Sequence, residues 1–175
     1  MTHLQIKPYI TEERLQKKVA EIGADLTKKF KGQQVVAVCV LKGSFIFYSD
    51  LIREINTDIK CEFFGVSSYH GTTSSGEVKV TLDLASPVEG KHVLLVEDIV
   101  DTGITMNYLK NSLLSRKPAS LTTVALLEKP EALKVPCKLD YVGFQVANEF
   151  VVGYGLDYQG YYRNLPFIGQ VQNFQ

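Results

Sequence analysis

The hydrophobic pattern in the first third of the chain predicts a helix, a buried strand and a second helix. Thr11 is a good N-cap residue, and apolar residues then recur at three- and four-residue spacing as far as Phe30, so the first helix is expected to end near Gly32. Residues 35–41 (VVAVCVL) are all apolar, which is typical of a parallel strand buried on both faces. A second helix is expected over 45–55.

The remaining pattern alternates between strands and a helix. Strands are expected over 60–67, 78–84, 92–96, 121–127 and 141–147, and a helix over 105–116 that ends before Pro118. Apolar strands that alternate with helices favour an α/β fold, with a mostly parallel central sheet and helices on both of its faces. The aromatic-rich segment from Phe150 onward is expected to be irregular and to cap a site rather than to join a sheet.

Composition and charge narrow the classes of function. The chain has 175 residues, and 19 Lys and Arg balance 19 Asp and Glu, which argues against a dedicated nucleic-acid binder. The longest purely apolar run is 35–41, far below the ~20 residues of a membrane helix, and no apolar signal core is visible near the N-terminus. Three cysteines without a CxxC pair suit a reducing compartment, so we expect a cytoplasmic protein of one domain over residues 1–175.

The strongest chemical signal is residues 93–105 (VLLVEDIVDTGIT). An apolar strand is expected to end at Glu97 and Asp98, and Asp101 follows after two apolar residues. Open α/β sheets bind ligands at the carboxyl ends of their strands. Residues 101–105 supply backbone N–H groups, two hydroxyls and a glycine at a helix N-terminus, which suits a phosphate. Taken singly, each residue fits a capped helix or a solvated loop, but together they favour a sugar-phosphate site in which the acids bind hydroxyls or hydrated Mg²⁺.

Residues 97–105 resemble the phosphoribosyl-diphosphate (PRPP) binding motif of type I phosphoribosyltransferases. Further motifs between about residues 6 and 169 resemble those of the hypoxanthine (hypoxanthine-guanine) phosphoribosyltransferases in particular. The resemblance implies the type I phosphoribosyltransferase fold, with a small hood formed by the chain ends at about 1–10 and 145–175.

The resemblance also implies roles for the motif. Glu97 and Asp98 would contact the ribose hydroxyls and the metal, and Asp101 would be the catalytic residue that accepts the proton at N7 of the purine. The 5′-phosphate would be held by Thr102, Gly103, Ile104 and Thr105. Ile104 departs from the Lys or other polar residue that is frequent at its position, but only its backbone N–H is needed for the phosphate.

Two loops gain a role from the same resemblance. Lys42 and Gly43, in residues 41–44 (LKGS), read by themselves as a solvated lysine and a turn, since no Walker motif is present. The resemblance makes them the pyrophosphate loop, where a strained non-proline cis peptide is common in the family. Residues 67–77 read as an ordinary surface loop, whereas the resemblance implies a lid in which Ser68 and Tyr69 close over the reaction centre and exclude water.

The purine side of the site is also implied by resemblance. Lys129 follows an apolar strand and would donate to the 6-oxo group of the purine, which selects hypoxanthine or guanine over adenine. In residues 150–158 (FVVGYGLDY), Phe150 would stack on the purine and the backbone of Val151 would contact its edge. Asp157 would hold a second Mg²⁺ through water, and Arg163 would reach pyrophosphate.

The resulting hypothesis is a purine salvage enzyme. It would transfer the 5-phosphoribosyl group of PRPP to N9 of hypoxanthine, and also of guanine, with Mg²⁺ as cofactor, and it would work as a homodimer or homotetramer without nucleic-acid or membrane partners. One alternative is a nucleotide-sensing or RNA-binding regulator on the same fold, which zero net charge and the presence of both Asp101 and Lys129 disfavour. Another is a PRPP-dependent transferase for xanthine or a pyrimidine.

Overall fold

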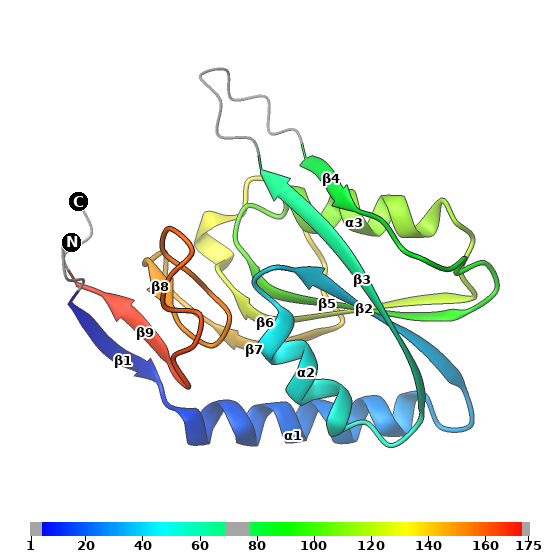
Figure 1. Cartoon of the computed structure of the whole chain (residues 1–175), viewed down its shortest axis with the longest axis horizontal. Coiled ribbons are helices and arrows are strands. Elements are labelled where there is room, and N and C mark those ends of the chain that lie inside the picture. The colour runs from blue at the N-terminus through cyan, green and yellow to red at the C-terminus, as the bar shows by residue number, and fades with distance from the viewer. Residues whose placement is uncertain (1–4, 69–77, 173–175) are drawn as a thin grey trace.

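The structure, a computed structural model, describes residues 5–68 and 78–172 and is built around a six-stranded sheet (Figure 1). The strands lie in the order β4–β3–β2–β5–β6–β7, and all neighbours are parallel except β4, which is antiparallel to β3. Their bounds are β2 (Gln34–Leu41), β3 (Asp58–Ser68), β4 (Val78–Leu82), β5 (His92–Val100), β6 (Ser120–Glu128) and β7 (Tyr141–Gln145). The expected α/β fold with a mostly parallel sheet is confirmed.

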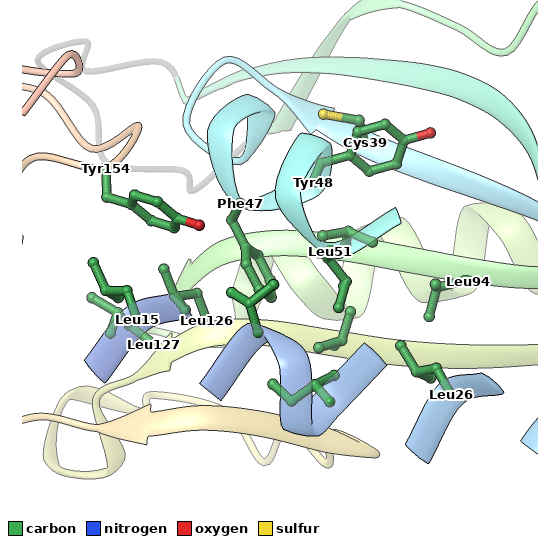
Figure 2. Packing of buried hydrophobic residues seen from close by; sticks show 14 of the residues in the cluster. Leu15, Leu26, Cys39, Phe47, Tyr48, Leu51, Leu94, Leu126, Leu127 and Tyr154 are labelled. Atoms are coloured by element: carbon green, nitrogen blue, oxygen red, sulfur yellow. The ribbon is translucent and has the colours of Figure 1, made fainter. Parts of the chain in front are cut away.

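Helices cover both faces of this sheet because the strands are apolar on both faces. Alternate residues of β2 point to opposite sides, so Ala37 and Cys39 pack in one buried cluster, and Val38 and Val40 pack in another. The first cluster contains α1 (Glu12–Lys29) and α2 (Phe45–Arg53), as Figure 2 shows in part, and the second contains α3 (Ile104–Leu114). None of the helices in the described part of the chain is long and apolar enough to cross a membrane.

Strands near the two ends of the chain form a second, smaller sheet. Its strands are β1 (Ile6–Ile10), β8 (Val151–Val152) and β9 (Ile168–Val171), antiparallel in the order β1–β9–β8. The expectation that the segment after Phe150 joins no sheet is wrong, because β8 and β9 both belong to this sheet. These strands are short, and β1 pairs with β9 across most of the chain length, so local periodicity does not reveal them.

The strand with the acidic motif runs further than the pattern predicts. Its pairing with β2 stops at Cys39–Val96, whereas its pairing with β6 continues to Val100–Glu128. Glu97 and Asp98 therefore lie inside β5, and the expectation that the strand ends there is wrong. Because β5 separates from β2 after Val96, both carboxylates lie where a gap opens between two neighbouring strands.

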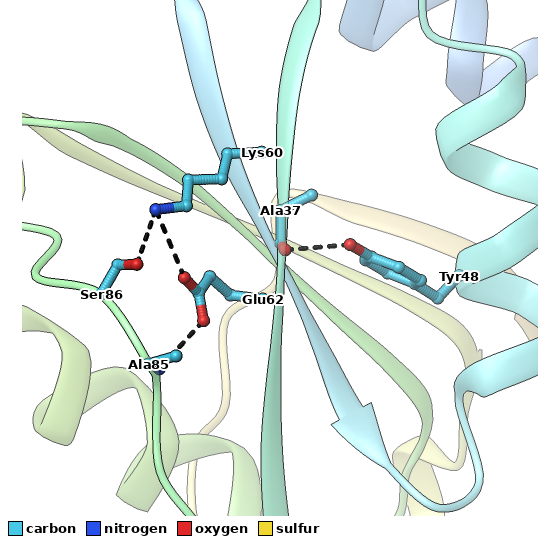
Figure 3. A network of polar contacts seen from close by, with 6 residues as sticks. All are labelled: Ala37, Tyr48, Lys60, Glu62, Ala85 and Ser86. Carbon is cyan, nitrogen blue, oxygen red and sulfur yellow. Dashed lines mark hydrogen bonds and ion pairs between the residues drawn. The ribbon is translucent and has the colours of Figure 1, made fainter.

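Two buried polar groups away from this gap have structural partners (Figure 3). The carboxylate of Glu62 on β3 accepts a hydrogen bond from the backbone N–H of Ala85 at 3.0 Å and lies 3.7 Å from the Lys60 ammonium. The hydroxyl of Tyr48 on α2 donates to the carbonyl of Ala37 at 3.0 Å. Both contacts tie neighbouring segments to the sheet, so neither group is a candidate for chemistry.

Candidate active site

The site lies where the chain changes direction across the sheet. From β2 the chain first adds β3 on one side and later adds β5, β6 and β7 on the other, so the carboxyl ends of β2 and β5 adjoin a switch point, where open α/β sheets bind ligands. The bond between Leu41 and Lys42 at the end of β2 is a non-proline cis peptide, as the resemblance implies. A Cβ atom at Gly43 would overlap the carboxylate of Asp98, so glycine at this position lets the loop pack directly against that side chain.

Glu97 and Asp98 form a buried acidic pair, and each residue is only 8% exposed. Burial raises the pKa of Glu97 well above its usual value, and the charge of Asp98 raises it further. Burial also raises the pKa of Asp98, although hydrogen bonds and the charge of Arg163 oppose the change. Glu97 Oε2 has no hydrogen-bond partner among the described residues. A cation or a hydroxyl donor would satisfy this oxygen.

The turn after β5 leads directly into α3. The carboxylate of Asp101, which is exposed, accepts the backbone N–H of Thr102, and the Thr102 hydroxyl accepts the N–H of Ile104 at 3.4 Å. Gly103 has φ +78° at the N-cap of α3. This turn and the acidic pair line a cavity of about 180 Å³, whose residues include Glu97, Asp98, Asp101, Thr102, Gly103 and Thr105. The predicted phosphate and ribose residues are thus brought together, with Ile104 at the first position of the helix.

A segment that the sequence did not single out supports this turn. The carbonyl of Thr102 accepts the N–H of Lys134 at 3.0 Å, and the Asn107 side chain donates to the carbonyl of Pro136 at 2.9 Å. A Cβ atom at Gly103 would lie 2.8 Å from the carbonyl oxygen of Val135. The turn therefore lies against residues 134–136, a packing that no local sequence signal indicates.

A second cavity, of about 280 Å³, adjoins the first and shares Asp98, Ile99 and Asp101 with it. Among its other lining residues are the three expected to contact the purine, namely Lys129, Phe150 and Val151, together with Asp157, which was expected to hold a metal ion, and Leu156, which was given no role. A hollow of about 450 Å³ lies at the opposite end of the sheet, and one of about 480 Å³ lies between α1 and β7, but neither contains a predicted site residue.

Lys129 is held at the border of this second cavity. Its backbone N–H donates to the carbonyl of Val100 at 2.9 Å, which places it directly beside the end of β5. Burial lowers the pKa of its ammonium group, while the carboxylates of Asp101 and Glu149 act in the opposite direction. A partly desolvated donor beside an acid is well suited to recognise a polar edge of a ligand.

Asp157 and Arg163 form an ion pair at the far edge of the same cavity. The Asp157 carboxylate lies 2.6 Å from the guanidinium of Arg163, which also donates to the carbonyl of Gly155 at 2.6 Å. The second carboxylate oxygen of Asp157 accepts the N–H of Gly160 at 2.6 Å. Both side chains are therefore held by protein groups, and Arg163 is close enough to Asp98 to lower its pKa.

The remaining expected residues are only partly described. Lys42 is exposed directly after β2, and Ser68 is the last residue of β3, where it pairs with Val78. The Ser68 side chain, Tyr69 and most of the expected lid lie outside the described residues. Within the described ranges no three His, Cys, Asp or Glu side chains form a metal cluster, so a cation here would depend on one or two carboxylates together with substrate and water oxygens.

Comparison with known proteins gives a consistent result. The family described as phosphoribosyl transferase domain matches residues 9–159. A hypoxanthine-guanine phosphoribosyltransferase of Bacillus subtilis is 49% identical over 170 residues, 97% of this chain and 94% of its own, and one of Staphylococcus aureus is 49% identical over 93% and 92%. A crystal structure of the Bacillus anthracis hypoxanthine-guanine phosphoribosyltransferase, with HEPES in its active site, has a TM-score of 0.92 at 44% identity and covers 97% of this chain and 100% of its own.

Proposed function

The chain belongs to the hypoxanthine-guanine phosphoribosyltransferase branch of the phosphoribosyl transferase family, and from this premise we propose how its residues perform purine salvage. The enzyme transfers the 5-phosphoribosyl group of PRPP to N9 of hypoxanthine, and also of guanine, and releases pyrophosphate. The observation that supports this reaction best is the pair of adjoining cavities. One has the features of a phosphate site, the other has those of a purine site, and Asp98 and Asp101 line both.

The phosphoribosyl group occupies the first cavity. The turn at 102–105 binds the 5′-phosphate through backbone N–H groups and hydroxyls at the start of α3. Glu97 and Asp98 bind the ribose hydroxyls, which supply the donors that Glu97 Oε2 lacks. Because the anomeric carbon gains positive charge as pyrophosphate leaves, these carboxylates also stabilise the transition state.

The purine occupies the second cavity. Phe150 stacks on its ring, the backbone of Val151 contacts its edge, and Lys129 donates to its 6-oxo group. Asp101 accepts the proton from N7 as N9 bonds to the anomeric carbon, so the positive charge of the purine is removed during the reaction. Adenine carries an amino group where Lys129 requires an acceptor, and it is therefore a poor substrate.

Pyrophosphate leaves along the loop after β2. Lys42 and the backbone of Gly43 bind it, and Arg163 provides a second positive charge. Mg²⁺ is the proposed cofactor, and it supplies neutralisation of the charge that the leaving pyrophosphate gains. Carboxylate oxygens are ligands that Mg²⁺ prefers, so the buried acidic pair Glu97 and Asp98 would hold such a cation, and Asp157 would hold a second ion through water.

The proposal extends to assembly and location. The rings of Phe45 on α2 and Phe63 on β3 are each 43% exposed, and Phe63 lies against Tyr48, 5.9 Å between ring centroids. An exposed aromatic surface of this kind suits an interface, and we assign it to a homodimer or homotetramer. All three cysteines are free thiols, which supports a cytoplasmic location.

The reaction is tested with a panel of purines. Protein, PRPP and Mg²⁺ are mixed separately with hypoxanthine, guanine, xanthine and adenine, and nucleotide formation is followed by ultraviolet absorbance. Turnover with hypoxanthine and guanine, but not adenine, is expected. Turnover with xanthine alone would favour the other-base alternative, and no turnover with any base would favour a nucleotide sensor. Excess EDTA should abolish the reaction and added Mg²⁺ should restore it; activity that persists in EDTA would contradict the metal assignment.

A further inference from the structure

The loop that carries the purine-site residues has an unusual backbone at its centre. Gly153, Tyr154 and Gly155 have φ values of +99°, +50° and +103° in succession. Glycine adopts this region freely, but a tyrosine does so at a cost, so its side chain needs compensating contacts. Tyr154 is only 2% exposed, and Figure 2 shows its ring directed toward α2 beside Phe47.

The compensating contact joins this loop to α2. The hydroxyl of Tyr154 donates to the carboxylate of Asp50 at 2.5 Å, across 104 residues of sequence. Burial raises the pKa of Tyr154, and the hydrogen bond with Asp50 raises it further, so the hydroxyl remains protonated and acts as the donor. A hydrogen bond between a neutral donor and a carboxylate is among the stronger kinds in proteins.

The position of this contact relative to the ligand residues gives it a role. Tyr154 lies between Val151 on one side and Leu156 and Asp157 on the other, and all three line the purine cavity. Its backbone N–H donates to the carbonyl of Leu165 at 2.9 Å, and the N–H of Gly155 donates to the carbonyl of Arg163 at 3.0 Å, so the turn is also attached to the C-terminal segment. The hydrogen bond to Asp50 is thus a side-chain anchor between the purine loop and a helix of the central fold.

The pyrophosphate loop has attachments of its own, although it also touches the purine loop, because a Cβ atom at Gly155 would lie 2.1 Å from the carbonyl oxygen of Gly43. Ser44 is fully buried, and its hydroxyl donates to the carbonyl of Val40 at 2.5 Å, while the N–H of Phe45 donates to the carbonyl of Lys42 at 3.4 Å. These contacts lie within the connection from β2 to α2. The phosphate turn after β5 is likewise supported by residues 134–136. Of the three ligand loops, the purine loop is the one that makes the Asp50–Tyr154 contact directly.

We infer that the Asp50–Tyr154 hydrogen bond is a positioning contact that sets the affinity of the enzyme for its purine. The contact touches no substrate and acts through the 150–157 loop. This inference rests on the proposed function, because it specifies how the purine site of that reaction is held. A displacement of the loop by a fraction of an ångström moves Phe150 and Val151 relative to the ribose bound by the other two loops.

The test compares Tyr154→Phe, Asp50→Ala and the double variant. Each is expected to raise KM for hypoxanthine about fivefold to tenfold, with a smaller rise in KM for PRPP, because the lost charge-assisted hydrogen bond belongs to the purine loop and reaches the pyrophosphate loop through the contact between Gly155 and Gly43. The double variant should be no worse than either single variant, since both remove the same contact. Asp50→Asn retains an acceptor oxygen and should restore most of the affinity for hypoxanthine.

Tyr48→Phe is the matched control. Tyr48 is a buried tyrosine of α2 whose hydroxyl bonds the Ala37 carbonyl in the sheet (Figure 3), so its removal should lower thermal stability without changing either KM. A smaller folded fraction lowers kcat but leaves KM unchanged, which separates positioning from stability. Unchanged KM for hypoxanthine in Tyr154→Phe, equal increases in both KM values, or additive effects in the double variant would overturn the inference, whereas an inactive wild-type enzyme would overturn the proposed function instead.

Discussion

Two acids that lie three residues apart in the motif differ in their surroundings. Asp98 is buried inside β5, accepts the N–H of Ile99 at 2.8 Å and has a raised pKa, whereas Asp101 is the first residue beyond the strand and is exposed. A group that binds hydroxyls or a cation benefits from a dry and fixed position. A group that accepts a proton must also release it to water, and the exposed position of Asp101 suits that role.

The substitution Asp101→Asn tests whether Asp101 is the group that accepts the proton. Asn keeps the size of the side chain and an oxygen that accepts the Thr102 N–H, but it cannot accept the N7 proton. We expect kcat to fall about 10²- to 10⁴-fold with little change in the affinity for PRPP, measured by steady-state kinetics and by calorimetry. Asp83→Asn, a carboxylate that pairs with Arg116 and lines neither cavity, is the control. Wild-type turnover in Asp101→Asn would remove the assignment of the base.

Lys129 is expected to determine which purine is accepted. Its ammonium group is partly buried and has a lowered pKa. Without this hydrogen-bond donor, the pocket no longer prefers an oxygen at position 6 of the purine. In Lys129→Ala, kcat/KM for hypoxanthine should fall about tenfold or more, and the ratio of hypoxanthine to adenine turnover should decrease. Lys91→Ala, at the opposite end of the sheet, should behave as wild type. An unchanged ratio would contradict the role given to Lys129.

At the scale of elements, the phosphate turn depends on how closely α3 approaches the segment after η1 (Pro130–Ala132). Gly103 has a positive φ, and a Cβ atom there would lie 2.8 Å from the Val135 carbonyl oxygen and 3.0 Å from Cys137 Cβ. Gly90 also has a positive φ, of +68°, but no atom lies within 4 Å of a Cβ there. Comparing alanine substitutions at the two glycines therefore separates the stability cost of a positive φ from the stability cost of crowding by neighbouring atoms.

We expect Gly90→Ala to lose about 1 kcal/mol of unfolding free energy, the usual cost of a left-handed alanine. Gly103→Ala should lose more, because the turn must also move away from residues 135–137. Urea unfolding measures both losses, and KM for PRPP should rise in Gly103→Ala alone. Equal effects of the two substitutions on stability and on KM would show that the close packing at Gly103 has no part in binding phosphate.

Sequence predicted those elements whose pattern is local. The strand at 35–41, the first helix and the turn at 101–105 each carry their own signals, and the structure has them within a few residues of the expected bounds. The extension of β5 to Val100 was missed because two acids within a strand read as its end unless the gap beside β2 is known. The small sheet and the Asp50–Tyr154 contact were missed because their partners are distant in sequence.

At the scale of the whole molecule, the small sheet connects the start of the chain to the purine loop. β1 leads into α1, β9 lies between β1 and β8, and β8 itself contains Val151, so the purine cavity is bordered by a sheet that the two chain ends build together. The phosphate cavity, in contrast, belongs to the central sheet. Binding of one nucleotide across both cavities therefore bridges the two sheets, and the Asp50–Tyr154 hydrogen bond already joins the loop after β8 to α2.

The proposed assembly leads to the last prediction. Phe63 is 43% exposed on β3, whereas Leu114, on α3 at the opposite face of the central sheet, is 51% exposed. The interface of a symmetric dimer contains each substituted residue twice. A loss of about 1.4 kcal/mol in the free energy of association weakens association about tenfold. We expect sedimentation velocity to show that Phe63→Ser dissociates at concentrations where the wild type and Leu114→Ser remain associated. If both variants sediment as the wild type does, the aromatic surface over α2 and β3 is not the interface.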